Sequence, residues 1–227
     1  MIDIVRIFIA AVFTLTITCA CSADNGKPGK NDEIHSLWIE CRLDKTLSFD
    51  IFNAAITGYH KTDNKRKKNI LTIIDFSKPS TAERFFVIDI DSSKLVYHCL
   101  VAHGKNSGDN YAQSFSNENG SLKSSLGFYL TAETYSGSHG YTLCLDGLEK
   151  NINDNARSRE IVIHGADYVS REFISKYGRL GKSWGCPALP LDISKEIINR
   201  ISNGSCLFIY GKDVNYSKNS LFLKVKN

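Results

Sequence analysis

A cysteine in a glycine-rich loop and a histidine at the end of an apolar run have the residue types and setting for covalent chemistry. Cys186 lies in the run Gly185-Cys186-Pro187, and His164 ends the run Ile161-Val162-Ile163-His164. A thiolate is a nucleophile, and a nearby imidazole favours it and can later pass a proton to an amine. The backbone N–H groups of Gly185 and Cys186 could bind a developing oxyanion. These residues predict cysteine catalysis.

Two other interpretations of the same residues stay open. Cys186 could form a disulfide with Cys41. It could also share a zinc ion with His164 and one of His103 or His139, although no zinc-finger spacing is present. We expect no metal and no cofactor.

The N-terminus predicts export. Arg6 is followed by an apolar stretch at 7–17 and by small residues at 18–23, which is the order of a secretory signal peptide. The apolar stretch is shorter than the about 20 residues of a membrane span. We therefore expect a protein of the periplasm or cell envelope. Cleavage could follow a small residue, or it could precede a cysteine and leave a lipid anchor; these positions are Ala20 or Ala23, and Cys19 or Cys21.

Export makes an unpaired thiol informative, because an oxidising compartment pairs cysteines. Five cysteines follow the predicted signal peptide, so at least one lacks an intramolecular partner. Cys99, Cys144 and Cys206 lie in apolar, strand-like runs, where a free cysteine behaves as a small hydrophobic residue. Cys186 lies instead in a loop rich in Gly, Pro and Ser, which singles it out.

The composition predicts one catalytic domain with a substantial sheet. The chain has 227 residues, of which 42% are hydrophobic, and 12 Phe and 10 Tyr accompany many β-branched residues. The net charge of +4 is mild, and the basic run 65–68 has no interleaved aromatic residues. We therefore expect no nucleic-acid partner.

The elements that must position the two residues follow from periodicity and from turn signals. We expect helices at 49–59, 170–177 and 193–202, the last with Asp192 as N-cap. The long polar segment 105–125 is predicted to border the site. The expected strands are 70–76, 84–90, 95–103, 126–134, 141–145, 160–164 and 206–210. The expected organisation is a signal peptide (1–23), a linker and N-terminal extension (24–47), a helical segment (48–68), the catalytic domain (69–215) and a tail (216–227).

Residues 85–211 resemble the L,D-transpeptidase catalytic domain family of peptidoglycan enzymes, in the branch with a Trp-Gly-Cys-Pro loop. The resemblance covers more than half of the chain, and its motifs occur in the family's order. They are Val101-Ala102-His103-Gly104, Ser124-Ser125-Leu126-Gly127-Phe128-Tyr129, His139-Gly140-Tyr141, Asp146-Gly147-Leu148, Asn155-Ala156-Arg157-Ser158, His164-Gly165-Ala166-Asp167-Tyr168 and the segment 178–190.

The resemblance implies a mainly β fold (β-rich α+β), a β-sandwich or partly closed barrel with a few short helices. It implies that Cys186 attacks the bond after the third residue of a tetrapeptide stem, where a diaminopimelate-type L-centre is joined to D-Ala, with His164 as base. A thioester acyl-enzyme forms. An amine from a second stem then gives a cross-link, or water gives carboxypeptidase trimming. Peptidoglycan stem peptides are the implied partners, and carbapenems could acylate the same thiol.

The sequence departs from the family pattern at one position. Many members carry a second histidine two residues before the nucleophile, and here that residue is Trp184. An indole can donate a hydrogen bond but cannot act as a base. The resemblance therefore leaves His164 as the sole base, and the group that orients it is open.

Several residues are predicted to contact the substrate. Arg157 and Arg179 could hold stem carboxylates, because arginine pairs with carboxylates bidentately, or they could form surface salt bridges. The remaining predicted contacts are Ser183, Trp184, His139 and Tyr141. A wall-binding module without catalysis is the alternative function.

Overall fold

The computed structural model describes residues 29–138 and 140–224. The predicted signal peptide, its cleavage positions and Cys19 and Cys21 lie outside the described residues. Within the described part of the chain, no helix has the length and apolar character needed to cross a membrane.

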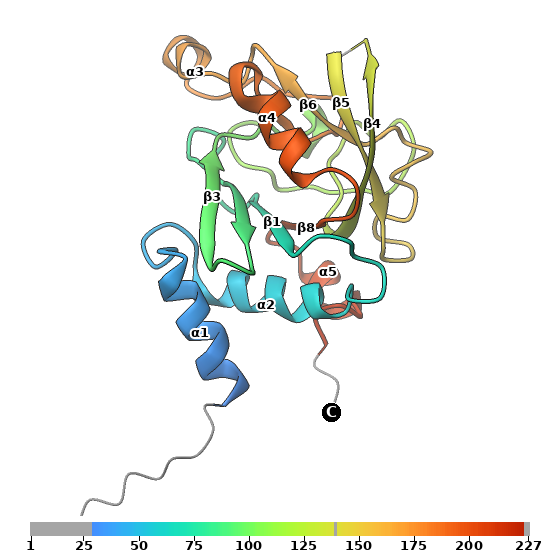
Figure 1. Ribbon diagram of the computed structural model, residues 1–227. Helices are drawn as coiled ribbons and strands as arrows, with labels where there is room; N and C mark the ends of the chain where they lie inside the picture. Colours follow the sequence, from blue (N-terminus) through green and yellow to red (C-terminus); the bar gives the residue numbers. More distant parts are fainter. Residues whose placement is uncertain (1–28, 139, 225–227) are drawn as a thin grey trace, which may run out of the picture.

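One mixed sheet of eight strands forms the body of the molecule (Figure 1). Along the sheet the strands lie in the order β3-β2-β1-β8-β4-β5-β6-β7, and the β1–β8 and β6–β7 pairs are parallel. Their bounds are β1 (Ile70–Asp75), β2 (Phe85–Asp89), β3 (Lys94–Cys99), β4 (Gly127–Gly137), β5 (Gly140–Gly147), β6 (Val162–Ala166), β7 (Ala188–Pro190) and β8 (Cys206–Tyr210).

The two edges of this sheet approach each other. Ala102, three residues after the end of β3, bridges Ala188 of β7, with N–O distances of 2.9 and 3.3 Å. The sheet is therefore nearly closed, and the predicted partly closed barrel is confirmed. The closure matters for function because it brings the chain after β3 to the loop that precedes β7.

The described residues also form short helices outside the sheet. They are α1 (Lys30–Glu40), α2 (Phe49–His60), α3 (Arg171–Tyr177), α4 (Leu191–Ile201) and α5 (Val214–Asn219), with a 3-10 turn at Lys105–Ser107. In Figure 1, α2 lies below β1 and β8, and it packs against both. Its buried residues recur at helical spacing, so the predicted helix at 49–59 is confirmed. α4 packs on β6 and β7.

The core fills the barrel with aromatic and β-branched side chains. β1 is buried along its whole length, and Phe128 of β4 stacks on Phe208 of β8 with ring centroids 4.3 Å apart. Gly58 of α2 is required for this packing, because a Cβ there would lie 2.0 Å from Cζ of Phe128.

Some predicted boundaries are wrong, for local reasons. α4 begins at Leu191 because the short strand β7, which was not predicted, runs directly into it, and Pro190 rather than Asp192 is its N-cap. β3 ends at Cys99, before the chain turns toward β7. Two helices lie where none was expected. They are α1, within the predicted N-terminal extension, and α5, which begins at Val214 and whose N-cap Asp213 accepts hydrogen bonds from two backbone amides.

Candidate active site

The pairing of β6 with β7 brings the loop that carries the predicted nucleophile next to the strand that carries the predicted base. His164 of β6 is opposite Ala188 of β7, and Cys186 comes two residues before Ala188. The Sγ atom of Cys186 lies 3.5 Å from the backbone N of Val162, two residues before His164. The fold therefore places the thiol against the β6 backbone, two residues before His164 in the sequence.

The Cys186 thiol lies in a half-buried setting with backbone partners on both sides. The Val162 N–H donates to Sγ, and the thiol can donate to the carbonyl oxygen of Glu160, also at 3.5 Å. Burial raises the pKa of Cys186, whereas the Val162 N–H and the positive charge of Arg159 lower it. Burial is the larger effect, so the setting favours the neutral thiol, and a base would help to form the thiolate.

A backbone carbonyl orients His164. Its Nδ1 lies 3.0 Å from the carbonyl oxygen of Gly165, and a carbonyl can only accept, so Nδ1 carries the proton and donates. Nε2 is then the ring atom that can take a proton. The side chain is buried, with 4% of its surface exposed. The orienting group that the sequence left open is a main-chain atom.

The loop before Cys186 is held by its own hydrogen bonds. The buried Ser183 Oγ donates to the Cys186 carbonyl at 2.5 Å and accepts from the Gly185 N–H at 3.1 Å. Gly185 has φ +134°, a conformation that favours glycine. In this conformation the Gly185 N–H, predicted as an oxyanion donor, is bound to Ser183 Oγ. Ser183, predicted to bind substrate, holds the loop through these two hydrogen bonds.

The segment 105–125 lies against this loop. Ser124 Oγ donates to the Gly185 carbonyl at 3.0 Å and accepts from the Gly104 N–H at 3.0 Å. A Cβ on Gly104 would lie 2.8 Å from Cα of Gly185, so the two backbones touch. The prediction that this polar segment borders the site is confirmed.

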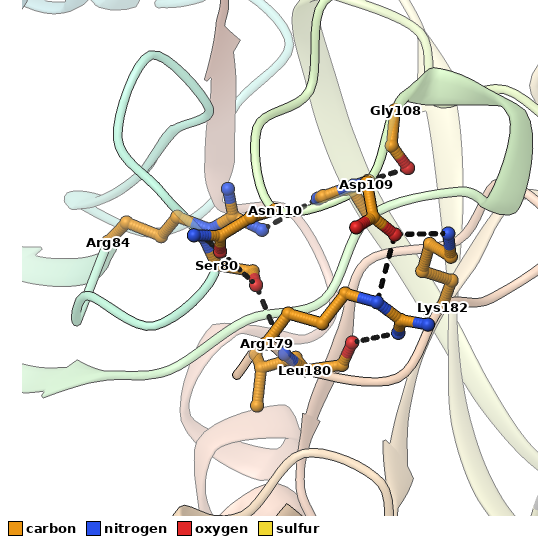
Figure 2. Close-up of polar contacts among 9 residues, drawn as sticks. Ser80, Arg84, Gly108, Asp109, Asn110, Arg179, Leu180 and Lys182 are labelled. Carbon is orange, nitrogen blue, oxygen red and sulfur yellow. Dashed lines mark hydrogen bonds and ion pairs between the residues drawn. The ribbon is translucent and has the colours of Figure 1, made fainter. Parts of the chain in front are cut away.

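Both arginines predicted to bind carboxylates already have acidic partners. Arg157 forms ion pairs with Glu133 of β4 and Asp146 of β5. Arg179 Nε lies 2.8 Å from Asp109, which also binds Lys182 Nζ at 3.0 Å (Figure 2). The salt bridges that we left open as the alternative are thus present for both.

The other predicted substrate contacts divide into three cases. Tyr141 contacts Asn199 of α4 at 2.7 Å, and its strand neighbour Thr142 pairs with His164. Because adjacent strand residues point to opposite faces, Tyr141 lies on the far face of the sheet from His164 and does not join the site. Trp184 is 77% exposed beside the nucleophile loop and is open to a ligand. His139 lies outside the described residues.

The alternatives for Cys186 gain no support. All five cysteines of the described residues are free, and Cys41 is buried near the end of α1. In the same part of the chain, no group of three or more His, Cys, Asp or Glu residues could hold a metal ion.

Sequence reasoning missed a buried pair beneath the loop. Arg84, the residue before β2, is fully buried, and its guanidinium donates to the Val101 and Lys78 carbonyls and to His103 Nδ1 at 2.8 Å. The His103 carbonyl in turn accepts from the Ser183 N–H at 3.1 Å. The partners of Arg84 come from two separate segments, at Lys78 and at 101–103, so no local signal marks it.

This pair predicts acid sensitivity. Burial and Arg84 lower the pKa of His103 from 6.5 to about 4. Because the folded protein binds this proton less readily than the unfolded chain, stability is full above about pH 6.5 and declines toward pH 4. The loss amounts to about 3 kcal/mol for this group. Urea unfolding across that range should show a steeper pH slope for the wild type than for His103→Gln, and equal slopes would contradict the prediction.

Comparison with known proteins supplies a family match. A model described as an L,D-transpeptidase catalytic domain matches residues 43–210. A search of curated proteins found no match.

Solved structures also match, at low identity. L,D-transpeptidase 3 from Mycobacterium tuberculosis has a TM-score of 0.41 and 11% identity, covering 63% of this chain and 62% of its own. The same enzyme with a faropenem-derived adduct gives 0.42 and 12%, covering 63% and 61%. An L,D-transpeptidase from Mycobacterium smegmatis gives 0.39 and 12%, covering 63% and 59%. The chain thus spans about three fifths of the length of these solved chains.

Proposed function

Because the L,D-transpeptidase catalytic domain model matches residues 43–210, the chain belongs to that family, and we propose that it joins peptidoglycan stem peptides through a thioester on Cys186. The observation that carries the proposal is the contact of Cys186 Sγ with the β6 backbone at Val162, two residues before His164. We further propose that the protein is exported and acts in the periplasm or cell envelope.

In the first half-reaction, Nε2 of His164 takes the thiol proton and the thiolate attacks the carbonyl carbon after the third stem residue. The resulting tetrahedral intermediate collapses when D-Ala leaves and its amine takes the proton from the imidazolium. A thioester remains on Cys186. The Gly165 carbonyl supports this exchange because it fixes the ring tautomer and favours the charged form of the ring.

In the second half-reaction, an amine from another stem attacks the thioester, and His164 takes its proton. The peptide bond forms and the thiolate is released. The N–H of Cys186 is the proposed oxyanion donor, since the Gly185 N–H is bound to Ser183. The exposed Trp184 side chain offers an apolar face to the stem beside the thiol.

The product mixture from a purified disaccharide tetrapeptide tests the proposal. Transpeptidation releases one D-Ala for each dimer formed, and mass spectrometry should find that dimer. A tripeptide product without dimer would instead indicate a carboxypeptidase. Binding to sacculi without release of D-Ala would indicate a silent wall-binding module.

A further inference from the structure

Arg159 lies in the turn before β6 and binds the segment 105–125 through its side chain. It lies three residues before Val162, and its side chain is half-buried. Its guanidinium donates to Ser116 O at 2.5 Å, Ser125 Oγ at 2.5 Å, Ser121 Oγ at 3.2 Å and Lys123 O at 2.7 Å. One side chain therefore fixes both ends of a ten-residue stretch of this segment.

The same guanidinium lies behind the nucleophile loop. A Cβ built on Gly185 would be 3.6 Å from Arg159 Nη2 and 3.0 Å from the Lys123 carbonyl oxygen. Ser124, between the anchored residues, donates to the Gly185 carbonyl. The backbone of Gly185, next to Cys186, thus packs against the residues 123–124, which lie within the stretch that Arg159 binds.

The charge of Arg159 is not neutralised by an ion pair. Among the salt bridges of the described residues none involves Arg159, whose four acceptors are two hydroxyls and two carbonyls. Arg157, two residues earlier, is instead paired with Glu133 and Asp146. Solvent screens the electrostatic interaction of a half-buried cation with nearby groups less than it screens that of an exposed cation. Accordingly, Arg159 lowers the pKa of the Cys186 thiol, against the effect of burial.

We propose that Arg159 is a positioning residue for the nucleophile. It holds the segment 116–125 against Gly185 and supplies an uncompensated positive charge behind the Cys186 thiolate. The inference rests on the proposed function only in that Cys186 is the nucleophile.

The test is the pH dependence of Cys186 alkylation by iodoacetamide, with the modified peptide identified by mass spectrometry. Arg159→Gln removes the charge and keeps hydrogen-bonding groups, so the midpoint of the alkylation profile should rise by about one pH unit. Arg159→Lys keeps the charge and should keep a midpoint near that of the wild type. Arg157→Gln is the matched control for the loss of a nearby cation, and its midpoint should be unchanged.

A purely structural role for Arg159 predicts a different outcome. A folded Arg159→Gln protein with the wild-type midpoint would overturn the proposal, and so would an equal rise in Arg157→Gln. If Arg159→Gln does not fold, Arg159→Lys against the wild type decides, because a raised midpoint with the charge retained would also overturn it. Alkylation needs no stem peptide, so failure of the proposed reaction would leave this readout intact and distinguishable.

Discussion

Replacement of Cys186 by serine is expected to reduce transfer from stem peptides at least about 1000-fold, because a serine hydroxyl is a far weaker nucleophile than a thiol beside the same base. The fold should survive, since the contacts of Sγ with Val162 and Glu160 are weak sulfur hydrogen bonds at 3.5 Å. The rate of D-Ala release from a tetrapeptide measures the loss, and the thermal unfolding midpoint reports the fold.

Cys144→Ser is the matched control for this change. Cys144 is also half-buried, and it pairs with Val162 from the opposite side, on β5. It has no part in the proposed reaction, so its serine variant should keep the wild-type rate. Full activity in Cys186→Ser, or an equal loss in Cys144→Ser, would contradict the assignment of the nucleophile.

Replacement of His164 by glutamine is expected to lower kcat about 100- to 10,000-fold, the usual contribution of a positioned general base. The effect should be large because no second histidine precedes the nucleophile, where Trp184 stands. Glutamine can keep a donor for the Gly165 carbonyl but cannot take the thiol proton. Steady-state release of D-Ala by the folded variant is the measurement.

His98→Gln controls for the general loss of an imidazole. His98 lies on β3, stacked on Phe86 with ring centroids 4.4 Å apart, and it contacts the Glu83 carbonyl. Its replacement should leave kcat at the wild-type value. A His164→Gln enzyme with more than about a tenth of wild-type kcat would show that another group is the base.

The parts of the fold that could be predicted from sequence are those set by local patterns. The apolar stretches at 70–76 and 206–210 became the paired central strands β1 and β8. The helical spacing of buried residues placed α2 within one residue. The roles proposed for Cys186 and His164 start from local signals, a thiol in a glycine-rich loop and an imidazole at the end of an apolar run.

What could not be predicted depends on contacts between distant segments. Whether the Gly185 N–H is free depends on the Ser183 rotamer, and whether Tyr141 reaches the site depends on the register of β5 with β6. Arg159 and Arg84 bind partners that are distant from them in the sequence, so neither differs in sequence from a surface arginine. Arg157, the more conspicuous motif residue, is the one with ordinary salt bridges.

The central claim, that Cys186 is an acylating nucleophile, is tested most directly by the mass of the purified protein after incubation with a carbapenem such as imipenem. Thiolate attack on the β-lactam carbonyl opens the ring without a leaving fragment, so the whole mass of the drug should be added once per chain. Peptide mapping should locate it on Cys186, and Cys186→Ser should show none. An unmodified wild-type protein, or an adduct on Cys144 or another residue, would contradict the account.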